Sequence, residues 1–325
     1  MSMQPGSFVE WQHAQVSTPR SVLAEVVRHA VGTRIEQVDR IVEGYENEVY
    51  RVRCADGQDV VVRILRFGRF SGDSTRSAAE ARAIGQARAA GVPAPEILLL
   101  DTVRIDGTEF PVMVQRTVPG RPLAEVVTSL SERQRHDVLA EIGGLIARIS
   151  GVHVNDERDW PTAMAAELAD RRSERDQVLA GGFSAAQFDQ MLDLLEGYVH
   201  DFPCQRWVLC HGDLSPQHIF VTGDGTDGDA VRVSGIIDFG DWKPGAPVHD
   251  LAVLRVRGPK LDLAPLLAGY GAHADDTYRR RLDLHTLDIA LSSLWIGVDE
   301  DDQACIERSS TLIRVLLANL GVPAF

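Results

Sequence analysis

The spacing of apolar and polar residues changes once along the chain, near residue 118. Before that point, short runs rich in Val and Ile alternate with polar segments, two of which contain Asp-Gly dipeptides. Such runs joined by glycine-containing turns predict antiparallel strands. The strands are expected near 49–52, 60–65, 96–104 and 110–117, and an Ala- and Arg-rich segment over 74–90 predicts a helix. The pattern therefore predicts a small antiparallel sheet that carries one main helix.

A helix and a tail are expected before this sheet. Thr18 followed by Pro19 is typical of an N-cap with proline at the first helical position, which predicts a helix through about Ala30. Residues 1–17 are expected to form a loose tail.

The chain after Pro119-Gly120 is mostly helical in pattern. Helices are expected near 131–150, 161–180, 185–200, 274–297 and 303–320. The exception is 208–240, where short apolar runs alternate with loops and a Gly- and Asp-rich segment at 223–229 predicts a hairpin tip. We therefore expect an α+β protein with a tail (1–17), a β-rich lobe (18–118) and a larger helical lobe (119–325).

Composition and charge restrict the class of partner. A hydrophobic content of 44% is ordinary for a globular protein, and 33 basic against 47 acidic residues give a formal charge of −14. This excess of acid argues against nucleic acid or a membrane surface as a partner and suits a cationic ligand. No secretory signal precedes the predicted helix, and the four cysteines show no metal-binding spacing, so a cytoplasmic protein with free thiols is expected.

The candidate chemistry lies in two short loops of the predicted hairpin region. The first loop reads His-Gly-Asp-Leu-Ser-Pro-Gln-His over 211–218, and the second reads Ile-Ile-Asp-Phe-Gly over 236–240. Asp213 can accept a proton from an attacking hydroxyl, and Asp238, at the end of an apolar strand, can hold a divalent metal ion on nucleotide phosphates. An aspartate that merely caps its own turn is the structural alternative for Asp213.

These two loops, together with Asp250-Leu251-Ala252, resemble the aminoglycoside phosphotransferase family, which is related to choline kinase and more distantly to protein kinases. The resemblance extends from about Gly44 to Ala252. It implies a bilobal, protein kinase-like fold and phosphoryl transfer from ATP or GTP to a small molecule. It further implies that Asp213 is the catalytic base and that Asp238 binds Mg²⁺.

His218 departs from the commonest pattern of that family, which has asparagine at this metal-binding position. In having histidine, the chain resembles the 2''-aminoglycoside and macrolide phosphotransferases. Imidazole nitrogen is a poor match for Mg²⁺, which prefers oxygen. His218 is therefore expected either to bind the metal in its neutral form or only to form hydrogen bonds in the loop.

Three neighbouring side chains are expected to support the two loops. Because His211 precedes the glycine, we expect it to hydrogen-bond backbone near the metal loop. Asp241 is expected to order its loop or to contact a second metal ion. Asp250 opens a helix, where a carboxylate suits the helix dipole, and the resemblance implies that it braces the catalytic loop.

Arg63 is the unusual residue of the β-rich lobe, because it interrupts the apolar run at 60–65. A charge in such a strand is rarely buried without a partner. The resemblance implies that Arg63 contacts the nucleotide phosphates and pairs with Glu80 on the following helix. It also implies a nucleotide-covering loop with Gly44 and Asn47, and a hinge that binds the base through the Arg116 carbonyl and the Val118 N–H.

The acceptor is the least determined part of this interpretation. The densest acidic run consists of Asp299, Glu300, Asp301 and Asp302, with Glu196 and Asp201 as weaker candidates for binding a cationic acceptor. Acidic residues at the start of the last helix also suit its dipole. Three functions stay open: a kinase for an aminoglycoside-type antibiotic, a kinase for a macrolide or another small molecule or metabolite, and a nucleotide-binding pseudokinase.

Overall fold

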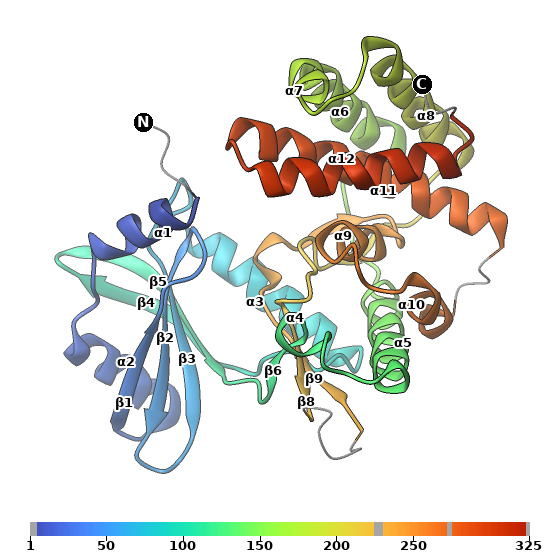
Figure 1. Ribbon diagram of the computed structural model, residues 1–325. Helices are drawn as coiled ribbons and strands as arrows, with labels where there is room; N and C mark the ends of the chain where they lie inside the picture. Colours follow the sequence, from blue (N-terminus) through green and yellow to red (C-terminus); the bar gives the residue numbers. More distant parts are fainter. Residues whose placement is uncertain (1–4, 224–229, 272–274, 323–325) are drawn as a thin grey trace. The chain divides into compact units, whose positions relative to one another are not determined.

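The chain folds into two compact units (Figure 1). The computed structural model describes residues 5–223, 230–271 and 275–322, and only the backbone of residues 5–8. The first unit comprises the described residues up to Ala89, Pro93–Pro119 and Gly235–Gly240, and the second comprises the remainder. The boundary expected after residue 118 lies one residue before the junction at Pro119-Gly120. The return of Gly235–Gly240 to the first unit is not predicted by the sequence pattern.

The first unit is built on a five-stranded antiparallel sheet with strand order β1-β2-β3-β5-β4. The strands are β1 (Ile35–Ile41), β2 (Asn47–Cys54), β3 (Asp59–Leu65), β4 (Ile97–Ile105) and β5 (Thr108–Arg116). The four strands expected from the apolar runs are confirmed, and β1 is an additional edge strand. The antiparallel sheet and the helices described below confirm the α+β fold.

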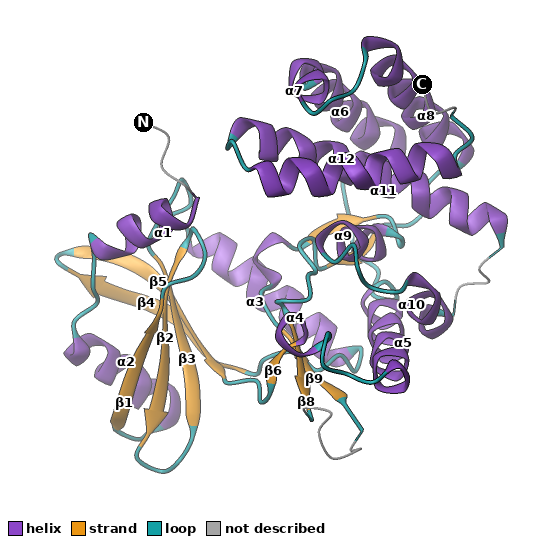
Figure 2. Cartoon of the chain, viewed as in Figure 1, coloured by secondary structure: helices purple, strands orange, loops and turns teal. Residues whose placement is uncertain are grey.

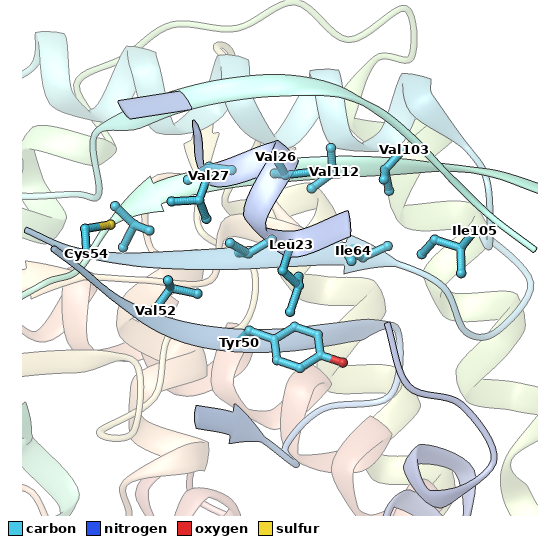
Figure 3. Close-up of a cluster of buried hydrophobic side chains, with 13 residues drawn as sticks. Leu23, Val26, Val27, Tyr50, Val52, Cys54, Ile64, Val103, Ile105 and Val112 are labelled. Atoms are coloured by element: carbon cyan, nitrogen blue, oxygen red, sulfur yellow. The ribbon is translucent and has the colours of Figure 1, made fainter. Parts of the chain in front are cut away.

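Alternation along the strands divides the side chains of the first unit between two faces. In β3, Val60, Val62 and Ile64 are fully buried, and they point to the face that α2 (Arg20–Val31) covers. Figure 3 shows Leu23, Val26 and Val27 of α2 packed on this face. The same cluster contains Tyr50, Val52 and Cys54 of β2, Val103 and Ile105 of β4, and Val112 and Val114 of β5. Arg63 has the opposite parity and points to the other face.

The amino-terminal segment corrects one expectation. Residues 5–14 form a helix, α1 (Pro5–Ala14), and are not a loose tail. Thr18 does not cap α2, because Pro19 occupies the N-cap position. Instead, the Thr18 hydroxyl donates a hydrogen bond to the buried carboxylate of Glu48, 2.7 Å away. The first unit also contains α3 (Ser74–Ala89), where one main helix is expected.

The second unit is mostly helical (Figure 2). Its helices are α4 (Leu123–Val126), α5 (Glu132–Ile149), α6 (Trp160–Ser173), α7 (Arg175–Ala180), α8 (Ala185–Asp201), α9 (His249–Arg257), α10 (Leu263–Tyr270), α11 (Asp276–Asp299) and α12 (Gln303–Asn319). Ser131 and Ser184 begin α5 and α8 with capping boxes. The helix expected over 161–180 is divided at Glu174, whose backbone leaves the helical region. Among the described helices, none has the length and apolar character needed to cross a membrane.

Short strands position the loops of the second unit. Strand β7 (Val208–Cys210) pairs with β10 (Lys243–Gly245), and a three-stranded sheet has the order β6-β8-β9. Its strands are β6 (Arg121–Pro122), β8 (Ile219–Thr222) and β9 (Arg232–Ile236). The hairpin expected over 208–240 is therefore built from β7, β8 and β9. Most of its expected tip, residues 224–229, lies outside the described residues.

Candidate active site

The loop from His211 to His218 follows β7 and depends on a glycine. Gly212 has φ +88°, and a Cβ atom at this position would lie 1.9 Å from the backbone oxygen of Asp241. The close approach and the left-handed backbone therefore both require glycine. Asp241 lies in a short 3-10 helix, η1 (Phe239–Asp241), and its backbone packs against this loop.

Asp250 braces the backbone of the same loop, as the resemblance implies. It is 1% exposed, and its two carboxylate oxygens accept hydrogen bonds from the N–H groups of His211 (2.9 Å) and Gly212 (3.1 Å). Burial raises the pKa of Asp250, while the nearby His211 and the two backbone hydrogen bonds oppose that rise. The first turn of α9 thus holds the loop through two charge-assisted bonds.

The two histidines of the loop have different hydrogen-bond roles. The N–H of Asp213 points to Nδ1 of His211 at 3.4 Å, so this nitrogen must accept. His218 Nδ1 lies 2.7 Å from the carbonyl oxygen of Asp213 and must donate. The neutral His218 ring therefore carries its lone pair on Nε2. Metal-binding histidines commonly donate their other ring N–H to a carbonyl in this way, so His218 fits a metal ligand.

The carboxylate of Asp213 has a partner that the sequence does not indicate. Arg257 Nη2 lies 2.9 Å from Asp213 Oδ1, and the two side chains are 51% and 28% exposed. Arg257 ends α9, the helix whose first turn contains Asp250. No spacing rule marks this arginine, because it reaches Asp213 only through the path of α9.

The first unit brings together the predicted phosphate-binding residues. Arg63 Nη1 binds the Glu80 carboxylate, and Arg63 Nη2 lies 3.2 Å from Asp238 Oδ1. Burial alone would lower the pKa of Arg63, but the carboxylates of Glu80 and Asp238 outweigh it, and the pKa is raised. Arg63 and Glu80 are about nine-tenths buried, whereas the Asp238 side chain is 47% exposed. A buried guanidinium that presents an exposed carboxylate is suited to binding phosphates with a hard cation.

Asp238 has an unusual backbone conformation. Its φ is +65°, in the left-handed region that aspartate tolerates better than most residues but still at a cost. Gly240 follows, and a Cβ atom there would lie 3.5 Å from Asp238 Oδ1. Asp238 belongs to the first unit, whereas His218 belongs to the second.

The loop expected to cover the nucleotide is joined to α1. Gly44 has φ +84°, and its carbonyl oxygen lies 3.1 Å from Nε2 of His13. Gln12 donates a hydrogen bond to the Tyr45 carbonyl at 2.9 Å. Asn47, at the end of this loop, begins β2 and pairs with Leu65. Helix α1, where a loose tail is expected from the sequence, therefore holds the loop that contains Gly44 and Tyr45.

The expected hinge residues lie at the end of β5. Arg116 is the last residue of β5, its N–H donates to the Glu96 carbonyl at 2.8 Å, and its side chain pairs with the Glu96 carboxylate. The Val118 side chain packs closely on Gly235. A Cβ atom added at Gly235 would lie 2.4 Å from Cγ1 of Val118. The expected contacts of the Arg116 carbonyl and the Val118 N–H with a base stay predictions.

A pocket of about 290 Å³ lies in the second unit, with Gly212 and Asp213 in its wall. The other walls come from α6, β10, α9 and α11. Its aromatic and apolar side chains include Trp160, Met164, Trp207, Val253, Ile289 and Ile296. Its charged side chains are Arg158, Glu167, Arg171, Asp213, Lys243, Arg257 and Asp288.

The acidic residues expected to bind the acceptor are not among those that line this pocket. Asp302 caps α12 by accepting a hydrogen bond from the Cys305 N–H at 3.0 Å. Asp299 and Glu300 end α11, and Asp301 lies in the turn between the two helices. Glu196 pairs with Arg172, and Asp201 with its neighbour His200. Asp302 therefore has the alternative role expected for the acidic run, because it stabilises the start of a helix.

Comparison with solved structures identifies the fold. The chain is similar to an aminoglycoside 2'-phosphotransferase-IIIa solved with GDP, with a TM-score of 0.62, 19% identity, and coverage of 93% of this chain and 100% of the other. It is also similar to a macrolide 2'-phosphotransferase from Brachybacterium faecium, with a TM-score of 0.58, 20% identity, and coverage of 93% and 99%. At such identities these likenesses show a shared kinase-like fold.

Sequence comparison adds a relative of another kind. A hydroxylysine kinase from Mus musculus is 24% identical over 273 residues, which cover 75% of this chain and 71% of the relative. The phosphotransferase enzyme family matches residues 37–285, a range that contains Arg63, Asp213 and Asp238. The chain therefore belongs to the phosphotransferase enzyme family.

Proposed function

We propose that the protein transfers the γ-phosphoryl group of ATP or GTP to a hydroxyl group of a small molecule. The observation that carries this proposal is the catalytic loop. Asp213 lies in the wall of a pocket, Asp250 holds the loop backbone before it, and Arg257 holds its carboxylate. A base whose side chain and preceding loop backbone are both held matches what phosphoryl transfer requires of the protein, which is mainly positioning.

Asp213 takes the role of base in this reaction. The acceptor oxygen forms a bond to the γ-phosphorus while the bond from phosphorus to the bridging oxygen breaks. The hydroxyl proton passes to the Asp213 carboxylate, and the nucleoside diphosphate leaves. A positioned base contributes ~10²–10⁴-fold to such a rate.

The nucleotide is assigned to the first unit. Arg63, held by Glu80, would contact the phosphates, and the loop from Gly44 to Asn47 would cover them. The Arg116 carbonyl and the Val118 N–H would bind the base. Mg²⁺, held by Asp238 with His218, would supply charge neutralisation on the phosphate oxygens. The pairing of Arg63 with Asp238 supports this assignment, because Arg63 would contact the phosphates and Asp238 would hold the Mg²⁺ bound to the same phosphates.

Two acceptor classes follow from the relatives, and the pocket favours one. An aminoglycoside-type antibiotic is a polycation and calls for several free carboxylates. Apart from Asp213, the pocket offers Glu167 and Asp288, and both already pair with Arg171. A pocket of about 290 Å³ is also at the small end for ligand sites. A small hydroxylated metabolite, the class that the hydroxylysine kinase acts on by name, is therefore the preferred acceptor.

The test is a phosphorylation screen with the D213N variant as control. Purified protein is incubated with ATP or GTP, Mg²⁺ and panels of aminoglycosides, macrolides and hydroxylated metabolites, and the phosphorylated product is detected by mass. We expect turnover of one panel by the native protein and at least ~10²-fold less by D213N, with nucleotide affinity nearly unchanged. Tight nucleotide binding without turnover of any acceptor would favour the pseudokinase.

A further inference from the structure

Three buried polar atoms in the pocket beside Asp213 have no hydrogen-bond partner within the described part of the chain. They are Nε2 of His249, Oδ1 of Asp288 and Nε of Arg171, in residues that are 6%, 8% and 6% exposed. A buried polar group without a partner is unfavourable, because it has lost its hydrogen bonds to water. Asp288 Oδ1 and Arg171 Nε face each other at 3.2 Å as an ion pair. Among the described residues, His249 Nε2 has no such counterpart and therefore marks a position where a ligand group can supply the missing bond.

The surroundings of Asp288 call for a positive ligand group. A single buried guanidinium, Arg171, faces three carboxylates: Glu174 at 2.5 Å, Asp288 at 3.2 Å and Glu167 at 3.7 Å. Burial raises the pKa of Asp288 to about 6, although Arg171 opposes the rise. The cluster holds more negative charge than Arg171 neutralises, and an ammonium group in the pocket would complete it.

The surroundings of His249 call for a ligand group that accepts hydrogen bonds. His249 Nδ1 lies 2.9 Å from His285 Nε2, and His285 Nδ1 lies 2.9 Å from the Tyr198 hydroxyl. Burial lowers the pKa of both histidines, which are therefore neutral. Because Arg281 donates to the Tyr198 oxygen, Tyr198 donates its own proton to His285. The neutral His285 ring then has its proton on Nε2 and donates it to Nδ1 of His249. The proton of the neutral His249 ring therefore lies on Nε2.

Lys243 adds a positive charge on the same side of the pocket. The pairing of β10 with β7 sets Lys243 opposite Cys210, the residue before the catalytic loop. Lys243 is exposed and lines the pocket, and within the described residues it forms no salt bridge. Its charge nevertheless acts on both Asp288 and His249. The pocket therefore has a cation and an N–H donor within electrostatic reach of the Asp288 carboxylate.

We propose that the acceptor is a hydroxylated α-amino acid, whose ammonium group binds Asp288 and whose carboxylate binds Lys243 and His249. An α-amino acid carries its ammonium and carboxylate groups on one carbon. A single head group can therefore bind both Asp288 and Lys243, which do not pair with each other. The hydroxyl on the side chain is the group offered to Asp213. This inference rests on the proposed phosphotransfer and names its acceptor class.

The first experiment compares matched acceptors. Serine, threonine, homoserine and hydroxylysine are assayed with ATP and GTP beside kanamycin and erythromycin, and the best amino acid is compared with analogues lacking either charge. For homoserine these analogues are propanolamine and γ-hydroxybutyrate. We expect kcat/KM for the amino acid to exceed that of either analogue by about 100-fold or more, the effect of losing one charged hydrogen-bonded contact. An analogue that performs equally well, or a preferred antibiotic, overturns the inference.

The second experiment separates the acceptor class from the reaction. Calorimetric titration of D213N with the same compounds measures acceptor binding without phosphotransfer. Selective binding of the amino acid supports the inference even if the native protein turns nothing over, in which case the proposed function fails alone. Absence of amino acid binding overturns the inference.

The third experiment uses the lysine content of the chain, which is limited to Lys243 and Lys260. K243Q should raise KM for the amino acid about tenfold or more and leave KM for the decarboxylated analogue unchanged. K260Q, a change at an exposed lysine outside the pocket lining, should alter neither. An unchanged KM in K243Q contradicts the assigned carboxylate contact.

Discussion

The guanidinium of Arg257 lies 2.9 Å from the carboxylate of Asp213, so the proposed base has an ion-pair partner on α9. The same helix places Asp250 under the backbone of His211 and Gly212. One helix therefore holds both the loop backbone before Asp213 and the Asp213 side chain. This arrangement orients the Asp213 carboxylate before an acceptor arrives.

Removing the charge of Arg257 is expected to lower turnover moderately. Because this ion pair is partly exposed, it contributes up to ~1 kcal/mol, which corresponds to about a fivefold loss of kcat in R257Q. The KM for nucleotide should not change. R257K should keep most of the activity, and R133Q, at a side chain that is 90% exposed, should match the native protein. Steady-state kinetics with an identified acceptor measures these values, and equal kcat for R257Q and R133Q would contradict the positioning role.

Gly212 is expected to tolerate no side chain. G212A adds a Cβ atom 1.9 Å from the Asp241 oxygen and also imposes the ~1–2 kcal/mol cost of a left-handed alanine. We expect a lower Tm and a loss of kcat of at least ~10²-fold as the loop shifts. Gly107 provides the matched control, because it has φ +84° with no atom within 4 Å of the added Cβ. G107A should lower Tm without changing kcat, and the idea fails if the two variants behave alike.

The parts of the fold that can be predicted from the sequence are those with a local signal. The apolar runs and the Asp-Gly turns determine four strands of the first sheet, because strand pairing follows from neighbouring residues. Arg63 attracts notice because it is a charge in an apolar strand, and its partner Glu80 lies on the next helix. The His-Gly-Asp spacing around Asp213 is similarly contained in a few residues.

Features created by contacts between distant parts of the chain cannot be predicted from local sequence patterns. Helix α1 is held partly by contacts of Gln12 and His13 with the Gly44 loop, which no local pattern reveals. Lys243 and Asp288 meet in one pocket from β10 and α11, far apart in the chain. The acidic run that ends at Asp302 attracted attention by its density alone, although a carboxylate at a helix start has a structural use.

The pairing of Arg63 with Glu80 is expected to show in a double-mutant cycle. R63Q, E80Q and the double variant are compared by urea unfolding and by nucleotide affinity. Because both side chains are about nine-tenths buried, R63Q leaves Glu80 buried without Arg63 and should cost ~3–5 kcal/mol. E80Q should cost less, since Asp238 still lies 3.2 Å from Arg63, and the two losses should not add. Nucleotide affinity should fall most in the variants that lack Arg63.

The exposed pair of Arg104 and Glu109 is the control for this cycle. Its side chains are 70% and 60% exposed, and its coupling energy should be ~1 kcal/mol or less. If both cycles give the same small coupling, the buried pair does not hold Arg63 for phosphate binding.

Asp288 is expected to make stability depend on pH. Its pKa is about 6 in the folded chain, raised by burial from 3.8, so the folded state binds this proton more tightly than the unfolded state. The stabilisation from Asp288 is therefore fully present below about pH 4 and is lost as pH rises through about 6. The charged groups that act on it are Arg171, Glu167, Asp170 and Lys243.

The measurement compares D288N with the native protein by urea unfolding between pH 4 and pH 8. Relative to D288N, the native protein should lose unfolding free energy as pH rises, with a slope of at most ~1.4 kcal/mol per pH unit between pH 4 and pH 6. D193N, at an exposed carboxylate on α8, should differ from the native protein by a nearly constant amount. A constant difference for D288N as well would mean that the buried carboxylate is fully compensated by Arg171, and the pocket would then lack the negative charge that an ammonium group requires.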